Sequence, residues 1–349
     1  TTGERVWHYQ LVHHGLWDYD PAHGPVLMDI TVDGRAIKAV TQLTKQAFAF
    51  VFDRVTGEPV WPIHERPVPQ SKTEGERTSP TQPFPTKPPA FDRQGATVDN
   101  LIDFTPELRA AALEIVSRFT MGPMFTPPTV VSDDPNGNQG TIQLPGSQGG
   151  ADVQGAAFDP ETGYLYVPSI TAPFVADIIA GNPDQTNLRY LHGQRRWIGG
   201  PRGLPLFKPP YGRITAIDMN HGDIIWQVAN GDGPRNHPAI RHLNLGPLGY
   251  QGRPAPLATK TLLFVGESGG FTPGGPRVTE DMLIEYSPNY GGPWFRAYNK
   301  ATGDIVWETE LPAGTTGNPI SYMHKGKQFI VVAVGSPEFA PAFIALALP

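Results

Sequence analysis

Cysteine is absent from all 349 residues of the chain. Its absence excludes disulfides, thiolate metal sites, cysteine nucleophiles and covalent haem attachment through a C-x-x-C-H motif within this sequence. It does not assign a compartment, because exported bacterial proteins often have no cysteine either. An excess of basic residues is also missing: 27 Lys and Arg stand against 33 Asp and Glu, a net charge of −6. The sequence has no basic stripe, so no nucleic-acid partner is expected.

Long apolar runs are lacking as well. No stretch of 18 or more apolar residues occurs, so no transmembrane helix is predicted. No signal peptide opens the printed sequence, because Thr1 to Arg5 are typical of a polar turn. The first residue is not Met, and the sequence opens in what resembles the middle of a strand pair. These features predict a processed product or a fragment.

Turn-forming and aromatic residues, by contrast, are plentiful. Glycine and proline each number 39, and aromatic residues make up 10% of the chain. Glycine and proline together are about a fifth of the sequence, which is below the range that suggests disorder. The chain is longer than a typical domain of about 100–200 residues, but large all-β domains exceed that length. The composition therefore favours an all-β domain with many turns.

A Gly-x-x-x-Trp pattern recurs four times along the chain. The copies end at Trp7, Trp61, Trp226 and Trp307, and residues 162–167 form a weaker copy. The later copies follow an apolar strand, with an Asp or Asn four residues before the glycine. These acidic or amide residues are Asp53, Asp159, Asp218 and Asn299. The pattern predicts β-hairpins in which glycine supplies the positive φ angle of the turn.

The spacing of these hairpins predicts a β-propeller. The glycines at 3, 57, 163, 222 and 303 are separated by 54, 106, 59 and 81 residues, and 106 is close to two periods of 53. Repeats of about 40–50 residues with four strands are typical of propeller blades. We expect one propeller domain over residues 1–349, incomplete at its N-terminus, with five to six blades. Each Trp would dock against the next blade. A β-sandwich with similar hairpins is the alternative.

Three segments interrupt the repeat. Residues 62–93 are rich in proline and predict an extended surface loop. Residues 106–118 predict one short inserted helix with Thr105 as its N-cap, because apolar residues share one helical face. Residues 268–293, rich in glycine and proline, predict a second inserted loop.

The most unusual local cluster is residues 13–20, His-His-Gly-Leu-Trp-Asp-Tyr-Asp, which we expect at the end of a strand. Asp18 lies between aromatic residues, where a desolvated carboxylate can act as a base, although aspartate is also a common turn former. Lys45 precedes an apolar strand and is either solvated or faces a cofactor carbonyl. The Gly-rich segment 146–152 has no following helix, so it is not a dinucleotide fingerprint. It is either a plain loop or backbone lying close to a flat ligand.

Several segments in order resemble the membrane-type quinoprotein glucose dehydrogenases and other dehydrogenases that depend on pyrroloquinoline quinone (PQQ). The resemblance covers almost the whole chain and places it in the C-terminal part of the family's propeller. The segments that carry it are residues 13–18, 78–84, 125–128, 144–150, 311–314 and 326–328.

The resemblance implies an eight-bladed propeller with PQQ near its axis and a bound Ca²⁺. It implies that Asp18 is the catalytic base, close to the Ca²⁺, and that it accepts the hydroxyl proton while hydride passes to PQQ. The basic residue 27 positions later, Lys45, would contact the quinone oxygen and stabilise the negative charge that develops there. The family is typically periplasmic, oxidises alcohols or sugars and passes electrons to a quinone or cytochrome.

Two departures from the family pattern bear on function. Related sequences usually carry Asn-Trp after the Gly-Gly motif, with the polar residue at the cofactor. Here Asp152 and Val153 follow it, and an extra carboxylate at Asp152 would repel anionic PQQ. The family also has earlier blades that supply the other Ca²⁺ ligands, so an N-terminal propeller fragment or homo-oligomerisation would be needed to complete the site. The alternatives are therefore a non-catalytic binding or scaffold propeller, or an inactive fragment. A propeller hydrolase or lyase has no supporting residue pattern.

Overall fold

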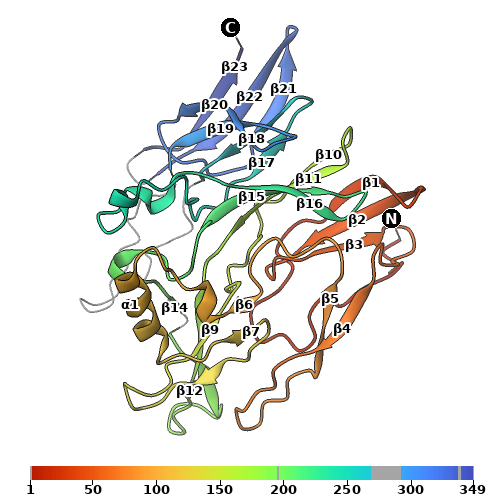
Figure 1. Ribbon diagram of the computed structural model, residues 1–349. Helices are drawn as coiled ribbons and strands as arrows, with labels where there is room; N and C mark the ends of the chain where they lie inside the picture. Colours follow the sequence, from red (N-terminus) through yellow and green to blue (C-terminus); the bar gives the residue numbers. More distant parts are fainter. Residues whose placement is uncertain (1, 195, 269–291, 337–338, 349) are drawn as a thin grey trace.

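The structure is a computed structural model that describes residues 2–194, 196–268, 292–336 and 339–348. Apart from its ends, the predicted inserted loop 268–293 lies outside the described residues. Four antiparallel sheets follow one another along the chain and through the molecule, from the red sheet near the N-terminus to the blue sheet near the C-terminus (Figure 1).

Each of these sheets is built mainly from strands joined by hairpins. The first contains β1 (Val26–Val32), β2 (Arg35–Leu43) and β3 (Ala49–Asp53). The second contains β10 (Ala157–Asp159), β11 (Tyr164–Ile170), β15 (Gly212–Asp218) and β16 (Asp223–Ala229). The third contains β17 (Pro256–Ala258), β18 (Leu262–Gly266), β19 (Trp294–Asn299) and β20 (Ile305–Glu310). The fourth contains β21 (Ile320–His324), β22 (Lys327–Val334) and β23 (Ala342–Ala347).

The period of two along the strands buries both faces of the second sheet. In β11, Leu165 and Val167 pack in one apolar cluster with the first sheet, whereas Tyr166 between them packs in another cluster with the third sheet. Neighbouring residues of a strand point to opposite faces, so one strand contributes to two cores. Val332 and Val334 continue the series by packing with Phe295 between the third and fourth sheets. This face-to-face order is that of successive propeller blades.

Tryptophan and glycine join the successive hairpins. A Cβ on Gly57 would lie 2.7 Å from Cγ of Trp7, and a Cβ on Gly303 would lie 2.8 Å from Cε3 of Trp226. The ring N–H groups of these two Trp residues donate to the carbonyls of Arg54 and Lys300, at 3.1 and 3.0 Å. In both cases the accepting residue lies three positions before the glycine.

The ring of Trp61 meets Gly222 in the same way, with 3.0 Å from the glycine's would-be Cβ to Cζ2. Three of the four Trp residues therefore dock on the turn of another hairpin, as the repeat predicts. The fourth, Trp307 in β20, is 43% exposed.

The expected blade count is not reproduced: the described residues form four blade-like sheets rather than five to six. The copy at residues 2–7 keeps its Trp contact but forms no strand, and the copy at 56–61 contributes only the bridge Phe52–Pro59. The interval of 106 residues was interpreted as two blades, but much of it is insertion. It contains a hairpin, a helix and short strands outside the four sheets.

The inserted elements lie mostly in the lower part of Figure 1. They are the hairpin β4 (Ile63–Pro67) and β5 (Thr81–Pro85), the pair β6 (Gly95–Ala96) and β7 (Gly122–Pro123), and α1 (Pro106–Val116). The strand β12 (Phe174–Ala180) pairs with β8 (Thr129–Val130), β9 (Thr141–Gln143), β13 (Tyr190–His192) and β14 (Arg196–Trp197). Four 3₁₀ turns complete the described elements: Val98–Asn100, Pro201–Gly203, Gly233–Asn236 and Arg241–Leu243.

Two of the predicted interruptions can be compared with the structure. The helix is confirmed: the Thr105 hydroxyl accepts from Leu108 N at 3.3 Å, and Leu108, Ala112 and Val116 are buried. The proline-rich segment 62–93 is not simply an extended loop, because it contains the β4–β5 hairpin. Its prolines fit a two-stranded ribbon, where many backbone N–H groups need no partner.

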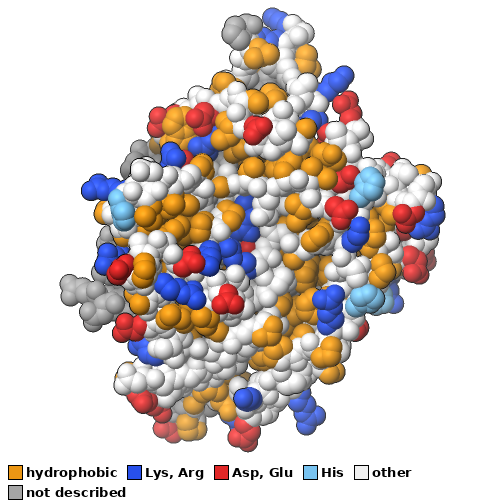
Figure 2. Space-filling model, viewed as in Figure 1, with side chains coloured by type: hydrophobic (Ala, Val, Ile, Leu, Met, Phe, Trp, Pro, Cys, Tyr) orange, Lys and Arg blue, Asp and Glu red, His pale blue; other side chains and the backbone are white. Residues whose placement is uncertain are grey.

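Apolar side chains reach the surface around the last two sheets, and Figure 2 shows several of them in the upper part of the molecule. Phe343 is 81% exposed, Met323 is 65% exposed and Val306 is 53% exposed. No helix in the described part of the chain is long and apolar enough to cross a membrane.

Candidate active site

The segment 17–20 presents two carboxylates on the same side. Trp17 and Tyr19 are 2% and 3% exposed, whereas the side chains of Asp18 and Asp20 are 50% and 60% exposed. Asp18 has φ +61°, so the backbone turns at this residue instead of running on as a strand. With the two aromatic rings buried on either side of the turn, the carboxylates of Asp18 and Asp20 both lie near Lys45.

The buried rings are fixed by directional contacts. Trp17 Nε1 donates to the carbonyl of Thr126 at 2.9 Å, and the Tyr19 hydroxyl donates to that of Pro145 at 2.6 Å. Phe125 packs edge-on against both rings, with centroids 5.2 and 5.9 Å away. Buried Trp and Tyr side chains usually need such partners for their polar ends. These contacts hold the backbone on either side of Asp18.

Lys45 lies in the turn between β2 and β3, and its side chain is only 8% exposed. Its ammonium donates to Asp20 Oδ1 at 2.5 Å and to the carbonyl oxygen of Asp18 at 2.9 Å. Asp18 Oδ1 lies 3.6 Å from the same nitrogen. The predicted pair of Asp18 and Lys45 therefore lies together in space, with Asp20 as a third member.

The charge of Lys45 acts most directly on Asp20. Burial raises the pKa of the Asp20 carboxyl. The hydrogen bond from Lys45 and its positive charge lower that pKa by more, so the pKa of Asp20 lies below its ordinary value. Asp20 thus remains ionised and holds the ammonium next to Asp18. The sequence analysis did not assign Asp20 a role, although its spacing of two from Asp18 was the available signal.

The Gly149–Gly150 turn lies directly against Lys45. Gly150 N donates to the carbonyl of Lys45 at 2.9 Å. Gly149 has φ +78°, and a Cβ there would lie 2.7 Å from the Lys45 Cα. Only glycine allows this approach, so the Gly-rich segment serves close packing of two backbones next to the charged cluster.

Asp152 follows that turn and forms a buried ion pair. Its Oδ2 lies 2.7 Å from Nη2 of Arg253, and both side chains are at most 10% exposed. Arg253 also donates to the carbonyl of Gln148 at 3.1 Å. The Arg253 guanidinium thus compensates the carboxylate that was expected to repel an anionic cofactor. Arg253 is the second residue that sequence reasoning missed, because its partner lies about a hundred positions away.

The two histidines before Asp18 contact the inserted segment. His13 Nε2 lies 2.9 Å from Glu65 in β4, and His14 Nε2 lies 2.8 Å from Glu76 in the loop between β4 and β5. Gln82 in β5 exchanges two hydrogen bonds with the backbone of His13. The β4–β5 hairpin therefore borders the site as a wall.

The structure brings together four of the motif segments that are far apart in the sequence. Residues 13–18 contact residues 78–84 through Gln82 and residues 125–128 through Thr126, and the adjacent Tyr19 contacts residues 144–150 through Pro145. The segments 311–314 and 326–328 lie with the fourth sheet instead. One cationic and two anionic side chains thus lie next to a glycine turn.

Comparison with known families now identifies the class. The family profile described as "PQQ: Glucose/ethanol/alcohol dehydrogenase, beta-propeller domain" matches residues 1–330. The chain therefore belongs to the PQQ-dependent dehydrogenase family, and its fold is a β-propeller, as predicted from the sequence.

Curated relatives extend along the whole chain. The quinoprotein glucose dehydrogenase of Gluconobacter oxydans is 31% identical over 388 residues, which cover 100% of this chain and 44% of that protein. The quinate/shikimate dehydrogenase (quinone) of Acinetobacter baylyi is 29% identical over 375 residues, which cover 100% of this chain and 43% of that protein. The chain thus spans less than half the length of these relatives.

Solved structures agree on the fold. The quinohemoprotein alcohol dehydrogenase from Comamonas testosteroni superposes with a TM-score of 0.52 at 20% identity, covering 96% of this chain and 37% of that one.

Proposed function

We propose that the chain forms part of a quinoprotein dehydrogenase that oxidises the CH–OH group of an alcohol or sugar. The observation that carries the proposal is the cluster of Asp18, Asp20 and Lys45, with Nζ of Lys45 2.5 Å from one carboxylate and 3.6 Å from the other. Membership of the family supports the class of reaction.

Each residue of the cluster has a distinct proposed role. Asp18 has an exposed carboxylate that can accept the proton of a substrate hydroxyl. Lys45 supplies a positive charge in a nearly buried position, where it stabilises negative charge more strongly than it would in water. Asp20 holds this ammonium in place through the shorter contact.

The residues present fit PQQ, a flat anionic quinone. The Lys45 ammonium would contact it, and the pairing of Asp152 with Arg253 balances the charge that was expected to repel it. When bound, PQQ supplies the two-electron acceptor that this chain's own side chains lack. Asp152 would then act as a cofactor neighbour whose charge is already balanced.

Calcium remains a prediction from the family resemblance. Among the described residues, no group of three or more His, Asp or Glu side chains is placed to hold a metal ion. Ca²⁺ takes six to eight oxygen ligands. Asp18 would supply one of them, and the others would come from a further segment.

The names of the relatives limit the choice of the first substrates to test. They include quinate or shikimate, glucose and glycerol, all of which carry several hydroxyl groups. We therefore place polyols and sugars ahead of simple alcohols. The quinone in the name of the Acinetobacter baylyi relative supports a quinone as electron acceptor, with a cytochrome as the alternative. A periplasmic location is proposed from the family alone.

A further propeller segment or a second copy of the chain is the proposed macromolecular partner. Trp307 is 43% exposed, whereas its counterparts Trp7, Trp61 and Trp226 dock on glycine turns. Ile305 in the same strand is 47% exposed and Phe343 in β23 is 81% exposed. An apolar surface of this kind is suited to cover by another blade.

The test is a titration of the purified chain with PQQ and Ca²⁺, followed by cofactor absorbance and by bleaching of an electron-accepting dye with a panel of polyols, sugars and alcohols. Stoichiometric binding with dye reduction is expected if the site is complete, and the panel then identifies the substrate class. Absence of binding by the chain alone and by its oligomers would favour the non-catalytic propeller or the inactive fragment.

Two variants separate the proposed roles. Asp18→Asn should abolish dye reduction while leaving PQQ binding largely intact, because it removes the base but keeps the shape. Lys45→Ala should slow reduction of the cofactor. Full activity of Asp18→Asn would remove Asp18 from the mechanism, and an unchanged rate for Lys45→Ala would leave Lys45 a purely structural residue.

A further inference from the structure

The turn that carries Lys45, between β2 and β3, is held by hydrogen bonds from other segments of the chain. Three consecutive carbonyls each accept a hydrogen bond from a different donor: that of Lys45 from Gly150 N at 2.9 Å, that of Gln46 from Gln94 Nε2 at 2.7 Å, and that of Ala47 from Phe91 N at 3.1 Å. Ala47 has φ +65°, a conformation that residues other than glycine seldom adopt. Such a turn needs its surroundings to keep it in place.

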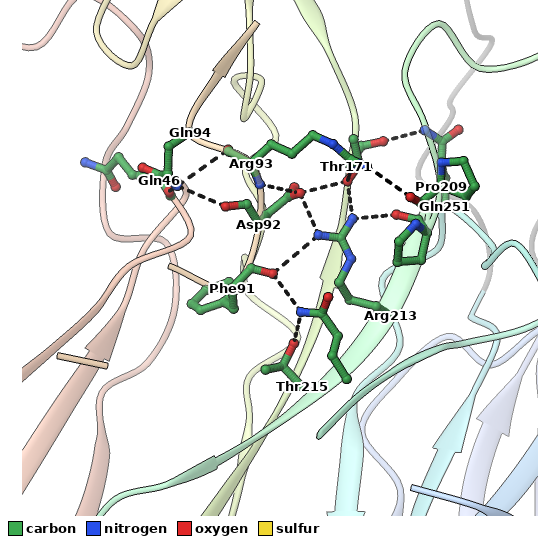
Figure 3. A network of polar contacts seen from close by, with 12 residues as sticks. Gln46, Phe91, Asp92, Arg93, Gln94, Thr171, Pro209, Arg213, Thr215 and Gln251 are labelled. Atoms are coloured by element: carbon green, nitrogen blue, oxygen red, sulfur yellow. Dashed lines mark hydrogen bonds and ion pairs between the residues drawn. The ribbon is translucent and has the colours of Figure 1, made fainter. Parts of the chain in front are cut away.

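Two of these three donors lie in one short segment, residues 91–94. This segment is fixed in turn by Arg213 in β15, which Figure 3 shows reaching Phe91 and Asp92. Arg213 Nη1 lies 2.5 Å from Asp92 Oδ1 and 3.3 Å from the carbonyl of Phe91. The Thr171 hydroxyl donates to the same Asp92 oxygen at 2.8 Å. A continuous path of contacts thus leads from β15 to the turn of Lys45.

The ion pair at the start of this path is fully buried. The side chains of Arg213 and Asp92 are 2% and 0% exposed. Buried ion pairs contribute little net stability because desolvation offsets their attraction, so stability alone is a weak reason for this pair. Their value lies in fixing one arrangement, since a guanidinium that binds several acceptors at once tolerates little displacement.

We propose that Asp92 and Arg213 form a positioning pair that acts through Phe91 and Gln94 to hold the turn of Lys45, and so sets where its ammonium lies relative to Asp18 and Asp20. The inference rests on the proposed function for the role of Lys45 in catalysis. The geometric effect on Lys45 can be measured without any cofactor.

The experiment measures how fast Lys45 reacts in the folded chain of 349 residues. Native lysines are dimethylated with isotope-labelled formaldehyde and borohydride, and the rate at each lysine is read by mass spectrometry. Lys45 is protected because its side chain is 8% exposed, whereas exposed Lys72 serves as the internal reference. A looser turn raises the rate at Lys45 relative to Lys72.

The first variant, Gln94→Met, breaks the path at its last step and keeps the ion pair. Loss of one buried hydrogen bond corresponds to about a five- to tenfold change in a local opening equilibrium, so Lys45 labelling should rise about five- to tenfold. The matched control is Gln251→Met. Its amide also donates a 2.7 Å bond to a backbone carbonyl, but that of Thr171, whose hydroxyl and not its carbonyl contacts Asp92 (Figure 3). This control should leave the Lys45 rate unchanged.

The second variant, Asp92→Asn, tests the ion pair itself. Its control is Asp159→Asn, which disrupts another buried pair: Asp159 Oδ2 lies 2.5 Å from Nζ of Lys300. Both variants lower global stability, but only Asp92→Asn should raise Lys45 labelling, by more than Gln94→Met does. If Asp92→Asn fails to fold, the comparison of Gln94→Met with Gln251→Met decides.

Equal Lys45 labelling in Gln94→Met and the parent chain would overturn the proposal, as would an equal rise in either control. If Lys45 labelling rises selectively in Gln94→Met but the parent chain does not bind PQQ, the positioning pair is supported and the proposed function is not. If the parent chain binds PQQ but Lys45 labelling is unchanged in Gln94→Met, the proposed function is supported and the positioning pair is not.

Discussion

The docking of tryptophan on glycine gives the sharpest stability prediction. Gly303 and Gly326 have the same φ angle, +77°. A Cβ on Gly303 would lie 2.8 Å from Trp226 Cε3 and 2.9 Å from Val228 Cγ1, whereas a Cβ on Gly326 would meet nothing within 4 Å. Alanine at the two sites therefore differs in packing and not in backbone strain.

The magnitudes follow from these two contributions. An alanine at positive φ costs roughly 1–2 kcal/mol, and both variants carry this cost. Overpacking against a docked ring adds about 1–3 kcal/mol, and only Gly303→Ala carries this second cost. Gly303→Ala should therefore lose about 1–3 kcal/mol more of the free energy of unfolding than Gly326→Ala. Equilibrium unfolding of both variants in urea, with the slopes compared, measures the difference.

Equal destabilisation of the two variants would refute the docking argument. A further check is the double variant Gly303→Ala with Trp226→Phe. The smaller ring relieves the clash, so the combined loss should be less than the sum of the single losses. Strict additivity would mean that the glycine and the tryptophan are not in contact.

Three further predictions concern charge. In Lys45→Ala, the pKa of Asp20 should rise towards its ordinary value of 3.8, as measured by NMR of ¹³C-labelled carboxyls. Because the pKa of Asp20 is lowered in the folded parent chain, its contribution to stability is present above pH 3.8 and is lost as the pH falls through the folded-state pKa. Arg253→Gln should destabilise by about 3–5 kcal/mol because it leaves the Asp152 carboxylate buried without a charged partner. The double variant with Asp152→Asn should recover most of that loss, as measured by urea unfolding. Burial lowers the pKa of His23 below 6.5, so on acidification this histidine is protonated in the unfolded chain at a higher pH than in the folded chain, and stability falls below pH 6.5. His23→Gln should therefore reduce the drop in melting temperature between pH 7.5 and 5.5. An unchanged drop would show that His23 does not cause it.

Local features of the fold were predictable because they depend on neighbouring residues. The Asp-x-x-x-Gly turns at Asp218 and Asn299 form the β15–β16 and β19–β20 hairpins, and Thr105 caps α1. The blade count was not confirmed, for a long-range reason. The 106-residue interval has the length of two repeats, and length alone does not distinguish two blades from an insertion with its own strand pairs.

The candidate site was also predictable only in part, because some of its partners are remote in the sequence. The family motif identified Asp18 and Lys45, and the structure places them together. The role of Asp20 follows from alternation with buried Trp17 and Tyr19, which requires knowing that both rings are inside. The partner of Asp152, Arg253, comes from another part of the chain, and only the folded topology brings it to the Gly-rich turn.

The position of Lys45 also explains why the site needs so much of the chain around it. A lysine side chain has many rotamers, and holding its ammonium beside two half-exposed carboxylates costs conformational entropy. The fold offsets this cost with contacts that are remote in sequence: the glycine turn at 149–150, the segment 91–94 and, behind it, Arg213 in the second sheet. In the proposed function, the Lys45 charge stabilises a reaction only if it is fixed before the negative charge develops, so we expect the buried network and the exposed aspartates to act together.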